Sequence, residues 1–365
     1  MRTGRTWVAA LATASALLAS LLLAASASAD ARSDAVAAFN QAQADSRVPA
    51  GWTGSTDPCN IGTESAASIN ATLSTLNIIR DFAGLTPVTF SDEKNQRALA
   101  AALIMKAQGA LSHDPPNTWK CWTDQGAFGA STSNLYLGES GASAMVGFTN
   151  DAGVDTLGHR RWILDPEALE MGTGSTGSTN ALVVIPAQTE PQGVAPGDKI
   201  VGWPSAGLFP SPWIFEDWSV AIGNSSTEDA ISVANARVSV KVDGEAAAVS
   251  GIRDIGGPGQ GYGTGATLTW KTQLPQAIVT GDHEIKVDIT GVTSGGAALP
   301  VSYTVDAFDP AGAGGPSAAC QKATTKLTKA KAKLKKARKG DKPAKIKKAK
   351  KKVKKAKAAR KKACA

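Results

Sequence analysis

Gly158-His159-Arg160-Arg161-Trp162-Ile163-Leu164 is the stretch on which the interpretation of this chain depends. The chain has three histidines, and a second one lies upstream in Leu111-Ser112-His113. An imidazole titrates near neutral pH and ligates metals, so two of them framing one domain indicate a shared site. The third, His283, lies in a strand-like stretch and is interpreted as a surface residue.

Helix signals surround these two segments. Apolar residues at three-residue steps predict a helix over residues 68–82, and another apolar face predicts one over 92–108. A third helix is predicted over 142–148, and short apolar runs such as 181–185 follow. Helices followed by short strands predict an α+β unit that ends near residue 225.

The pattern changes after this unit. Apolar and polar residues alternate over 238–242, 285–289 and 301–305, and glycine-rich turns separate these runs. A period of two with turns at short spacing predicts a small immunoglobulin-like β-sandwich over residues 226–311.

The first 67 residues are expected to contribute little to the fold. Arg2 and Arg5 precede an apolar run, and Ala27-Ser28-Ala29 provides a small-residue cleavage site. This arrangement predicts a signal peptide over residues 1–29 and a secreted protein, with an uncleaved membrane anchor as the alternative. Residues 30–67 are rich in Ala, Ser and Gly and are predicted to be a weakly structured lead-in.

Four cysteines are consistent with an oxidising compartment. Three pairings are possible, and we expect Cys59–Cys121 and Cys320–Cys364 because each of these pairs lies within one region. No Cys-x-x-Cys spacing occurs, so neither a zinc knuckle nor a redox motif is supported.

The C-terminal part, residues 312–365, is a linker followed by a basic tail. Residues 321–363 hold 22 of the 39 Lys and Arg residues and one acid, which leaves 17 bases and 30 acids elsewhere. Good helix formers on both sides of Gly340-Asp341-Lys342-Pro343 predict a Lys-rich helical hairpin closed by Cys320–Cys364. A disordered polycation is the alternative, because lysines repel one another.

The charge of this tail predicts polyanionic partners. It has no aromatic residue on which a base could stack, and the protein is predicted to be exported, so nucleic acid is not the expected partner. We therefore expect residues 321–363 to contact anionic cell-envelope polymers or lipid headgroups.

Residues 68–222 contain an ordered series of motifs. In chain order these are Asn77-Ile78-Ile79-Arg80, Ala83-Gly84-Leu85-Thr86-Pro87-Val88, Leu111-Ser112-His113, Asn134-Leu135-Tyr136-Leu137-Gly138, and Gly158 to Leu164 followed by Gly172-Thr173-Gly174. The series resembles the CAP superfamily (cysteine-rich secretory proteins, antigen 5 and pathogenesis-related 1 proteins) in its bacterial secreted, SCP-like form. The resemblance covers somewhat under half of the chain. It implies an α-β-α sandwich over residues 68–225 with a cleft that holds two histidines and two acidic residues.

The family's cleft residues carry over only in part. His113 and His159 match the two histidines. The glutamate that the family places just before Asn134 is Ser133 in this chain. The second acidic position falls on Asp151, so the resemblance implies a cleft that lacks one acid.

The missing acid limits the chemistry that the cleft is expected to support. His113, His159 and Asp151 are candidate ligands for zinc or another divalent metal, with an open position for water. The alternative is that both imidazoles only hydrogen-bond to loops across the cleft. A Ser133–His159–Asp151 triad lacks a nucleophile-elbow pattern.

Two functions follow from these residues. We expect a cell-envelope-associated binding module whose cleft holds a lipid or another small ligand, because hydrolysis would need a general base that Ser133 alone does not supply. The alternative is a metal-dependent hydrolase that uses His113, His159 and Asp151. Arg160 is a further candidate in the cleft as an anion contact, unless one of the two arginines pairs with Asp165 or Glu167 while the other is solvated.

Overall fold

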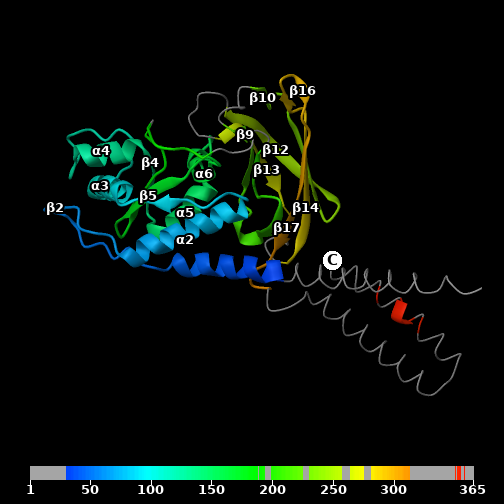
Figure 1. Cartoon of the computed structure of the whole chain (residues 1–365), viewed down its shortest axis with the longest axis horizontal. Coiled ribbons are helices and arrows are strands. Elements are labelled where there is room, and N and C mark those ends of the chain that lie inside the picture. The colour runs from blue at the N-terminus through cyan, green and yellow to red at the C-terminus, as the bar shows by residue number, and fades with distance from the viewer. Residues whose placement is uncertain are drawn as a thin grey trace, which may run out of the picture.

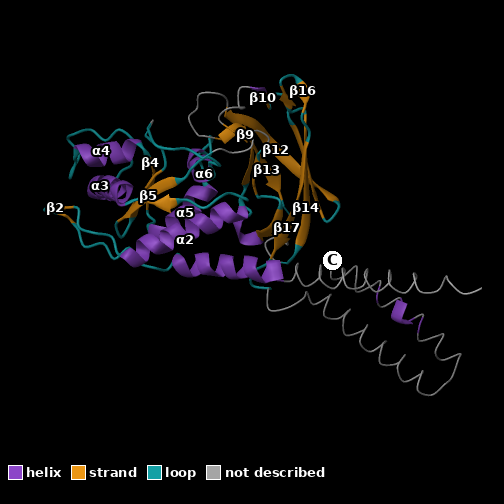
Figure 2. Ribbon diagram, viewed as in Figure 1, coloured by secondary structure: helices purple, strands orange, loops and turns teal. Residues whose placement is uncertain are grey.

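The computed structural model describes the chain from residue 30 to residue 312 with internal gaps. The described ranges are 30–187, 189–193, 199–224, 230–256, 264–274 and 281–312, together with 350, 352–354 and 357. The predicted signal peptide, most of the basic tail and the predicted Cys320–Cys364 pair lie outside these ranges. Within them, no helix is long and apolar enough to cross a membrane. The described part is a mixed α+β structure, with most helices at one end and a large β-sheet at the other (Figures 1 and 2).

A four-stranded sheet forms the middle layer of the helical end. Its strand order is β3-β5-β6-β4, with β3 parallel to β5 and the other neighbours antiparallel. The strands are β3 (Thr89–Phe90), β4 (Ser133–Leu137), β5 (Glu170–Ser175) and β6 (Thr179–Val183). Alternate residues of β6 enter different cores: Ala181 and Val183 join one cluster and Leu182 joins the other.

Helices cover both faces of this sheet. They are α2 (Ala66–Phe82), α3 (Asp92–Gln108), α4 (Asp124–Ser131), α5 (Gly141–Asn150) and α6 (Gly158–Ile163). Buried residues of α3 and α4 pack on the Ala181 and Val183 side, whereas buried residues of α2 and α5 pack on the Leu182 side. The result is an α-β-α arrangement, and the predicted helices over 68–82, 92–108 and 142–148 are confirmed as α2, α3 and α5.

Two glycines allow α3 to lie directly on the sheet. A Cβ at Gly172 of β5 would lie 2.2 Å from the Lys94 Cβ, and one at Gly174 would lie 2.0 Å from the Leu99 nitrogen. Real side chains do not approach so closely, so this face of β5 requires glycine. The Gly172-Thr173-Gly174 motif therefore sets the distance between the helix and the sheet.

The prediction of a weakly structured lead-in over residues 30–67 is wrong for its first part. Residues 30–45 are helical and run along the lower side of the molecule in Figure 1, where they are blue. Phe39 and Ala42 are buried, and the Phe39 ring centroid lies 5.2 Å from that of Trp213. Alanine is a strong helix former, and packing of this apolar face supplies the stability that composition alone did not reveal.

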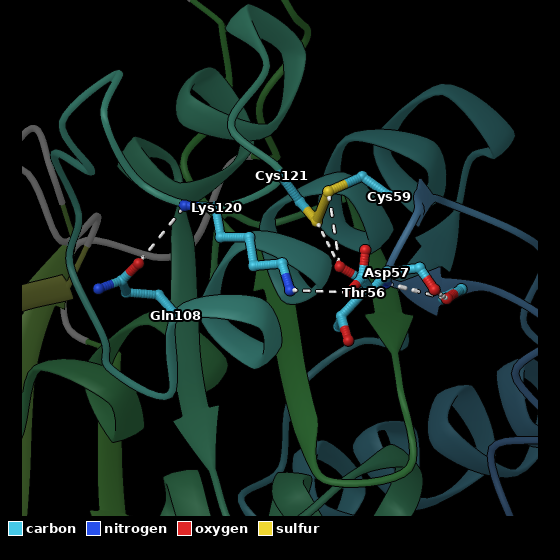
Figure 3. Close-up of a disulfide and its surroundings, with 7 residues drawn as sticks. Thr56, Asp57, Cys59, Gln108, Lys120 and Cys121 are labelled. Carbon is cyan, nitrogen blue, oxygen red and sulfur yellow. Dashed lines mark hydrogen bonds and ion pairs between the residues drawn. A yellow bond between two sulfur atoms is a disulfide. The ribbon is translucent and has the colours of Figure 1, made fainter.

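A disulfide joins the rest of the lead-in to the helical unit. The hairpin of β1 (Ser55–Thr56) and β2 (Cys59–Asn60) is bonded through Cys59 to Cys121, with Cα atoms 5.4 Å apart (Figure 3). This confirms one of the two predicted pairs. Because the bridged residues are 62 positions apart, the bond restricts a long segment of the unfolded chain.

The second unit is an eight-stranded sheet. Its strand order is β7-β9-β13-β12-β11-β14-β17-β8, and a three-stranded sheet of β10, β15 and β16 lies beside it. The strands of the large sheet are β7 (Ile200–Trp203), β8 (Gly207–Pro210), β9 (Asp217–Asn224), β11 (Arg237–Val242), β12 (Glu245–Gly256), β13 (Thr264–Gln273), β14 (His283–Thr290) and β17 (Val301–Phe308). The small strands are β10 (Ile231–Ser232), β15 (Thr293–Ser294) and β16 (Ala297–Ala298).

This sheet begins at Ile200. The alternation of apolar residues places the start of an immunoglobulin-like sandwich at residue 226, so the predicted boundary is too late. β7 and β8 are the two outermost strands, yet only three residues separate them in sequence. The sheet must therefore curl until its two ends approach each other. β9 pairs with β13 and β8 pairs with β17, so residues 200–224 belong to this sheet.

The two units share one hydrophobic core. The ring of Phe82, at the end of α2, contacts the rings of Phe209, Trp213 and Phe308 with centroids 5.7–6.3 Å apart. A single cluster of buried residues runs from α2 and α5 into the interior of the large sheet. The helical unit and the β unit are therefore packed as one body at this junction.

Candidate functional site

The two predicted site histidines line one pocket. This cavity of about 400 Å³ also has Ser133 and Asn134 in its wall, and α6 forms one of its sides. The prediction that His113 and His159 face a shared site is therefore consistent with the geometry.

Each imidazole is held through the same ring nitrogen. The His113 Nδ1 lies 3.0 Å from the carbonyl oxygen of Ala130, and the His159 Nδ1 lies 2.7 Å from Asp151 Oδ1. A carbonyl oxygen and a carboxylate only accept hydrogen bonds, so Nδ1 carries the proton in both rings. In the neutral form each Nε2 then retains its lone pair and is the nitrogen left for a ligand.

Asp151 lies behind His159. Its Oδ1 accepts the His159 bond, and its Oδ2 accepts a hydrogen bond of 3.1 Å from the backbone N–H of Arg160. The side chain is 1% exposed, whereas that of His159 is 26% exposed. Asp151 therefore orients the imidazole from within the protein.

The backbone around this carboxylate is unusual. Asp151 ends α5 with φ of 54°, and Leu157 precedes α6 with φ of 46°. Non-glycine residues seldom adopt this left-handed conformation, although aspartate tolerates it better than most. The two turns bend residues 151–157 so that the carboxylate of one helix end meets the imidazole at the start of the next.

The predicted three-ligand metal site does not fit these residues. Both Asp151 oxygens are already committed to His159 and to the Arg160 backbone. In the described ranges, no group of three or more His, Cys, Asp or Glu side chains is placed to hold a metal ion. Glu139, the other acid near the motif, accepts a hydrogen bond from Ser143 and does not line the pocket. The donor set is therefore two imidazoles without a carboxylate.

Ser133 and Asn134 have different roles in the wall. The Asn134 Nδ2 donates to the carbonyl oxygen of His159 at 3.0 Å, which fastens α6 to β4. Ser133 is 4% exposed, and its hydroxyl oxygen is buried with no hydrogen-bond partner. A buried hydroxyl without a partner lowers stability by about 1–3 kcal/mol. A ligand that hydrogen-bonds to Ser133 would remove this cost.

Arg160 is not the anion contact that the sequence suggested. Its guanidinium is buried and donates to the carbonyl oxygens of Thr149, Asn150 and Asp217 and to the Ser219 hydroxyl. Burial lowers the pKa of Arg160 to about 10, and the charges of Asp151 and Asp217 oppose this change. The residue is still cationic at neutral pH, where it ties the end of α5 to β9.

Arg161 is also buried, so neither arginine is the solvated one that was expected. Its guanidinium donates to the carbonyl oxygen of Ile255 in β12 at 2.7 Å. The carbonyl oxygen of Asp165 instead accepts from Arg80, a buried cation of α2. The two residues that follow His159 thus connect the pocket directly to the large sheet.

Sequence reasoning missed part of the pocket wall. Trp162, Ser131, Thr156 and Ile185 were not named as site residues, yet all four line the cavity. Each lies within three positions of a recognised motif or at the end of a predicted apolar run. Proximity to the motifs was the available signal.

Comparisons with known proteins find similarity in the helical unit. The model of the cysteine-rich secretory protein family, CAP, matches residues 73–185, a range that includes both histidines, Ser133, Asp151 and Arg160. No curated protein matches the chain.

One solved structure is similar over a limited region. It is the crystal structure of an extracellular protein containing an SCP domain from Bacillus anthracis str. Ames, with 19% sequence identity and a TM-score of 0.26. The similarity covers 32% of this chain and 40% of that one, so this chain spans less than half of that protein's length. On the evidence of the family model, residues 73–185 form a domain of the cysteine-rich secretory protein (CAP) family.

Proposed function

We propose that this chain is a secreted, cell-envelope-associated binding protein whose His113–His159 pocket holds an envelope component without covalent chemistry. The observation that carries the proposal is the donor set of the pocket. Two imidazoles present Nε2 while their Nδ1 atoms are held by the protein, and no carboxylate lies beside them in the wall. Such a wall recognises polar groups through hydrogen bonds.

The rest of the chain gives this binding protein its setting. The signal-like residues 1–29, the Cys59–Cys121 disulfide and the secretory family of residues 73–185 all support export. In this proposal the large sheet, residues 200–308, spaces the cleft from the tail. Residues 321–363, with 22 basic residues, retain the protein on anionic envelope polymers or lipid headgroups.

A sedimentation assay with bacterial envelope fragments tests both parts. The chain from residue 30 should co-sediment at low salt, and a variant that ends at residue 312 should lose most of this retention. The bound fraction of the full chain should fall steeply between about 50 and 200 mM NaCl, because its contacts release counterions. Equal retention of both chains in moderate salt would refute the role of the tail.

The cleft is tested separately with the truncated chain. Binding that persists in high salt should disappear in the His113→Ala/His159→Ala double variant, with His283→Ala as the matched control. Zinc titration by calorimetry tests the hydrolase alternative. One-to-one zinc binding that the double variant loses would contradict the proposal that the pocket binds its ligand without a metal.

A further inference from the structure

The pocket wall is polar but carries no charged side chain. Among the described residues, no Lys, Arg, Asp or Glu side chain lines the cavity that holds His113 and His159. Cationic groups or several N–H donors bind phosphate and carboxylate ligands best, and a protein metal site takes three or more His, Cys, Asp or Glu ligands, a group that the described residues do not form. The wall lacks both sets, so a ligand that matches it is uncharged.

The polar groups of the wall match hydroxyl groups. The hydroxyls of Ser133 and Thr156 can donate and accept, the Ser131 hydroxyl donates to the Phe128 carbonyl oxygen and can still accept, and the two imidazole Nε2 atoms accept. A ligand with several hydroxyls pairs with every one of these groups, because each of its own hydroxyls also donates and accepts. It would in addition supply the partner that the buried Ser133 hydroxyl lacks.

The same wall holds an aromatic side chain. Trp162 is half-buried and lines the pocket together with Val154 and Ile185. An indole presents a broad apolar face, which suits the C–H face of a sugar ring. Hydroxyl partners around an aromatic face are the two features that a carbohydrate requires together.

The pocket continues past His159. A second cavity of about 240 Å³ shares Val154 and His159 with the first. Leu111, Leu137 and Phe148 give it apolar surface, and Asp151 also lines it, although that carboxyl is 1% exposed and is bonded to His159. Leu111 is 44% exposed and Leu137 is 43% exposed. The groove is therefore longer than one sugar ring, and its second part has apolar surface for an acetyl group or for the C–H face of a neighbouring ring.

We propose that this groove binds a neutral, hydroxyl-rich oligosaccharide, with one ring on Trp162 and its hydroxyls on His113, Ser133 and His159. The inference rests on the proposed function, because it names the class of envelope component that the cleft would hold. The cleft and the basic tail would then bind different partners. The cleft would bind an uncharged glycan, and the tail would bind anionic polymers or lipid headgroups.

The test uses the full chain from residue 30 and neutral probes, which the tail cannot attract by charge. Tri-N-acetylchitotriose, cellotriose, maltotriose and mannotriose are titrated while the imidazole and indole N–H signals are followed by NMR. At least one sugar should shift the signals of His113, His159 and Trp162 in a saturable way. Ser133→Ala should weaken that binding about tenfold, the value of one good hydrogen bond to a buried group.

Matched variants distinguish the site from general surface binding. Trp162→Leu should weaken binding at least tenfold, whereas Trp122→Leu, at a half-buried tryptophan of another cavity, should leave it unchanged. Ser143→Ala is the control for Ser133→Ala, since Ser143 lies outside the groove. Equal effects of the site and control variants would overturn the proposal.

Two further titrations separate this inference from the proposed function. If sodium phosphate or hexanoate shifts the His159 signal and none of the sugars does, the cleft binds ligands but the glycan assignment is wrong. If no probe moves either histidine, both the assignment and the binding role of the cleft are wrong.

Discussion

At the scale of single residues, the pocket depends on where two protons sit. Asp151 and the Ala130 carbonyl oxygen each hold an imidazole through Nδ1, so Nε2 is the ring nitrogen left to contact a ligand. The acceptor that fixes His159 is a buried carboxyl group, while the acceptor that fixes His113 is a backbone oxygen. A single substitution can therefore change one histidine and leave the other as an internal reference.

Asp151→Asn should reverse the tautomer of His159. The amide has one oxygen, and the backbone N–H of Arg160 requires it, so the amide nitrogen must face Nδ1 of the imidazole. The ring then carries its proton on Nε2. Side-chain ¹⁵N spectra should show this exchange for His159 and no change for His113, and asparagine should keep the fold because it tolerates the left-handed backbone. A His159 spectrum identical to the wild type would contradict the role given to Asp151.

Asp165 should make stability depend on pH. Burial raises the pKa of this carboxyl from 3.8 to about 6, although the Glu167 backbone N–H and the Arg80 charge oppose the change. Between these two pH values the native state binds more protons than the unfolded state, so the free energy of unfolding falls as the pH rises. The whole effect is worth about 3 kcal/mol.

Asp165→Asn should remove this dependence while retaining an oxygen for the Glu167 N–H. Relative to the wild type, the variant should gain stability between pH 4 and pH 7 in urea unfolding experiments. Asp155→Asn is the control, because its side chain is 90% exposed and its charge carries no burial cost. Parallel pH profiles for wild type and Asp165→Asn would show that the buried carboxyl is not the cause.

At the scale of elements, α6 is the part that joins the two units. It is only six residues long, and such a helix is not stable alone. Its position comes from Asn134 of β4, Asp151 at the end of α5, and the carbonyl oxygens that receive the two arginines. The pocket is therefore shaped partly by strands that follow the CAP domain.

Arg160→Lys should loosen this connection. One ammonium group cannot serve the four acceptors that the guanidinium reaches, and buried acceptors without partners cost stability, here about 3 kcal/mol. The His159 signal should shift or broaden while that of His113 stays in place. Arg253→Lys is the control, since Arg253 also crosses to the first unit, through Asp155, but both side chains are exposed. A uniform change at both histidines would indicate general destabilisation and contradict a specific positioning role.

The elements that local pattern could predict are those with clear periodicity. α2, α3 and α5 carry apolar residues at helical spacing, and β11, β14 and β17 alternate, so each was predicted within a few residues. α6 was not predicted because its conformation depends on distant carbonyl oxygens. β8 and β9 were assigned to the wrong unit because their partners β17 and β13 lie about 40 to 100 residues further along the chain, and β7 pairs with β9.

The candidate site was predictable to a similar degree. Its histidines were found because His is rare in the chain, and Ser133, Asn134 and Asp151 were found because the family resemblance marks their positions. What failed was the direction of side chains. The residue types at positions 151 and 160 do not indicate that Asp151 contacts the His159 imidazole or that Arg160 contacts strand β9.

At the scale of the whole molecule, the shared aromatic core should make both units unfold together. Phe82 touches three rings of the β unit, and the core cluster is continuous across the junction. The NMR signals of His159 in the first unit and His283 in the second should therefore vanish at the same denaturant concentration. Earlier loss of either signal would contradict a single cooperative unit.

Phe82→Ala should lower that common midpoint for both signals. Removing a buried ring costs about 3–5 kcal/mol, and here the cavity would open between the units. Phe128→Ala is the matched control, because this α4 ring is 49% exposed and should change stability by less than about 1 kcal/mol.

The two arginines after His159 also limit which segments of this chain can be exchanged by recombination. Recombination that joined residues 73–185 to a foreign C-terminal partner would bring along two buried cations and leave behind the carbonyl oxygens of Asp217 and Ile255 that receive them. In the hybrid each guanidinium would lose an acceptor beside the pocket, which costs stability at a buried charge. The family match ends at residue 185, but residues 73–185 cannot be transferred alone without this loss. A stable recombinant would have to keep the helical and β units together or replace both arginines.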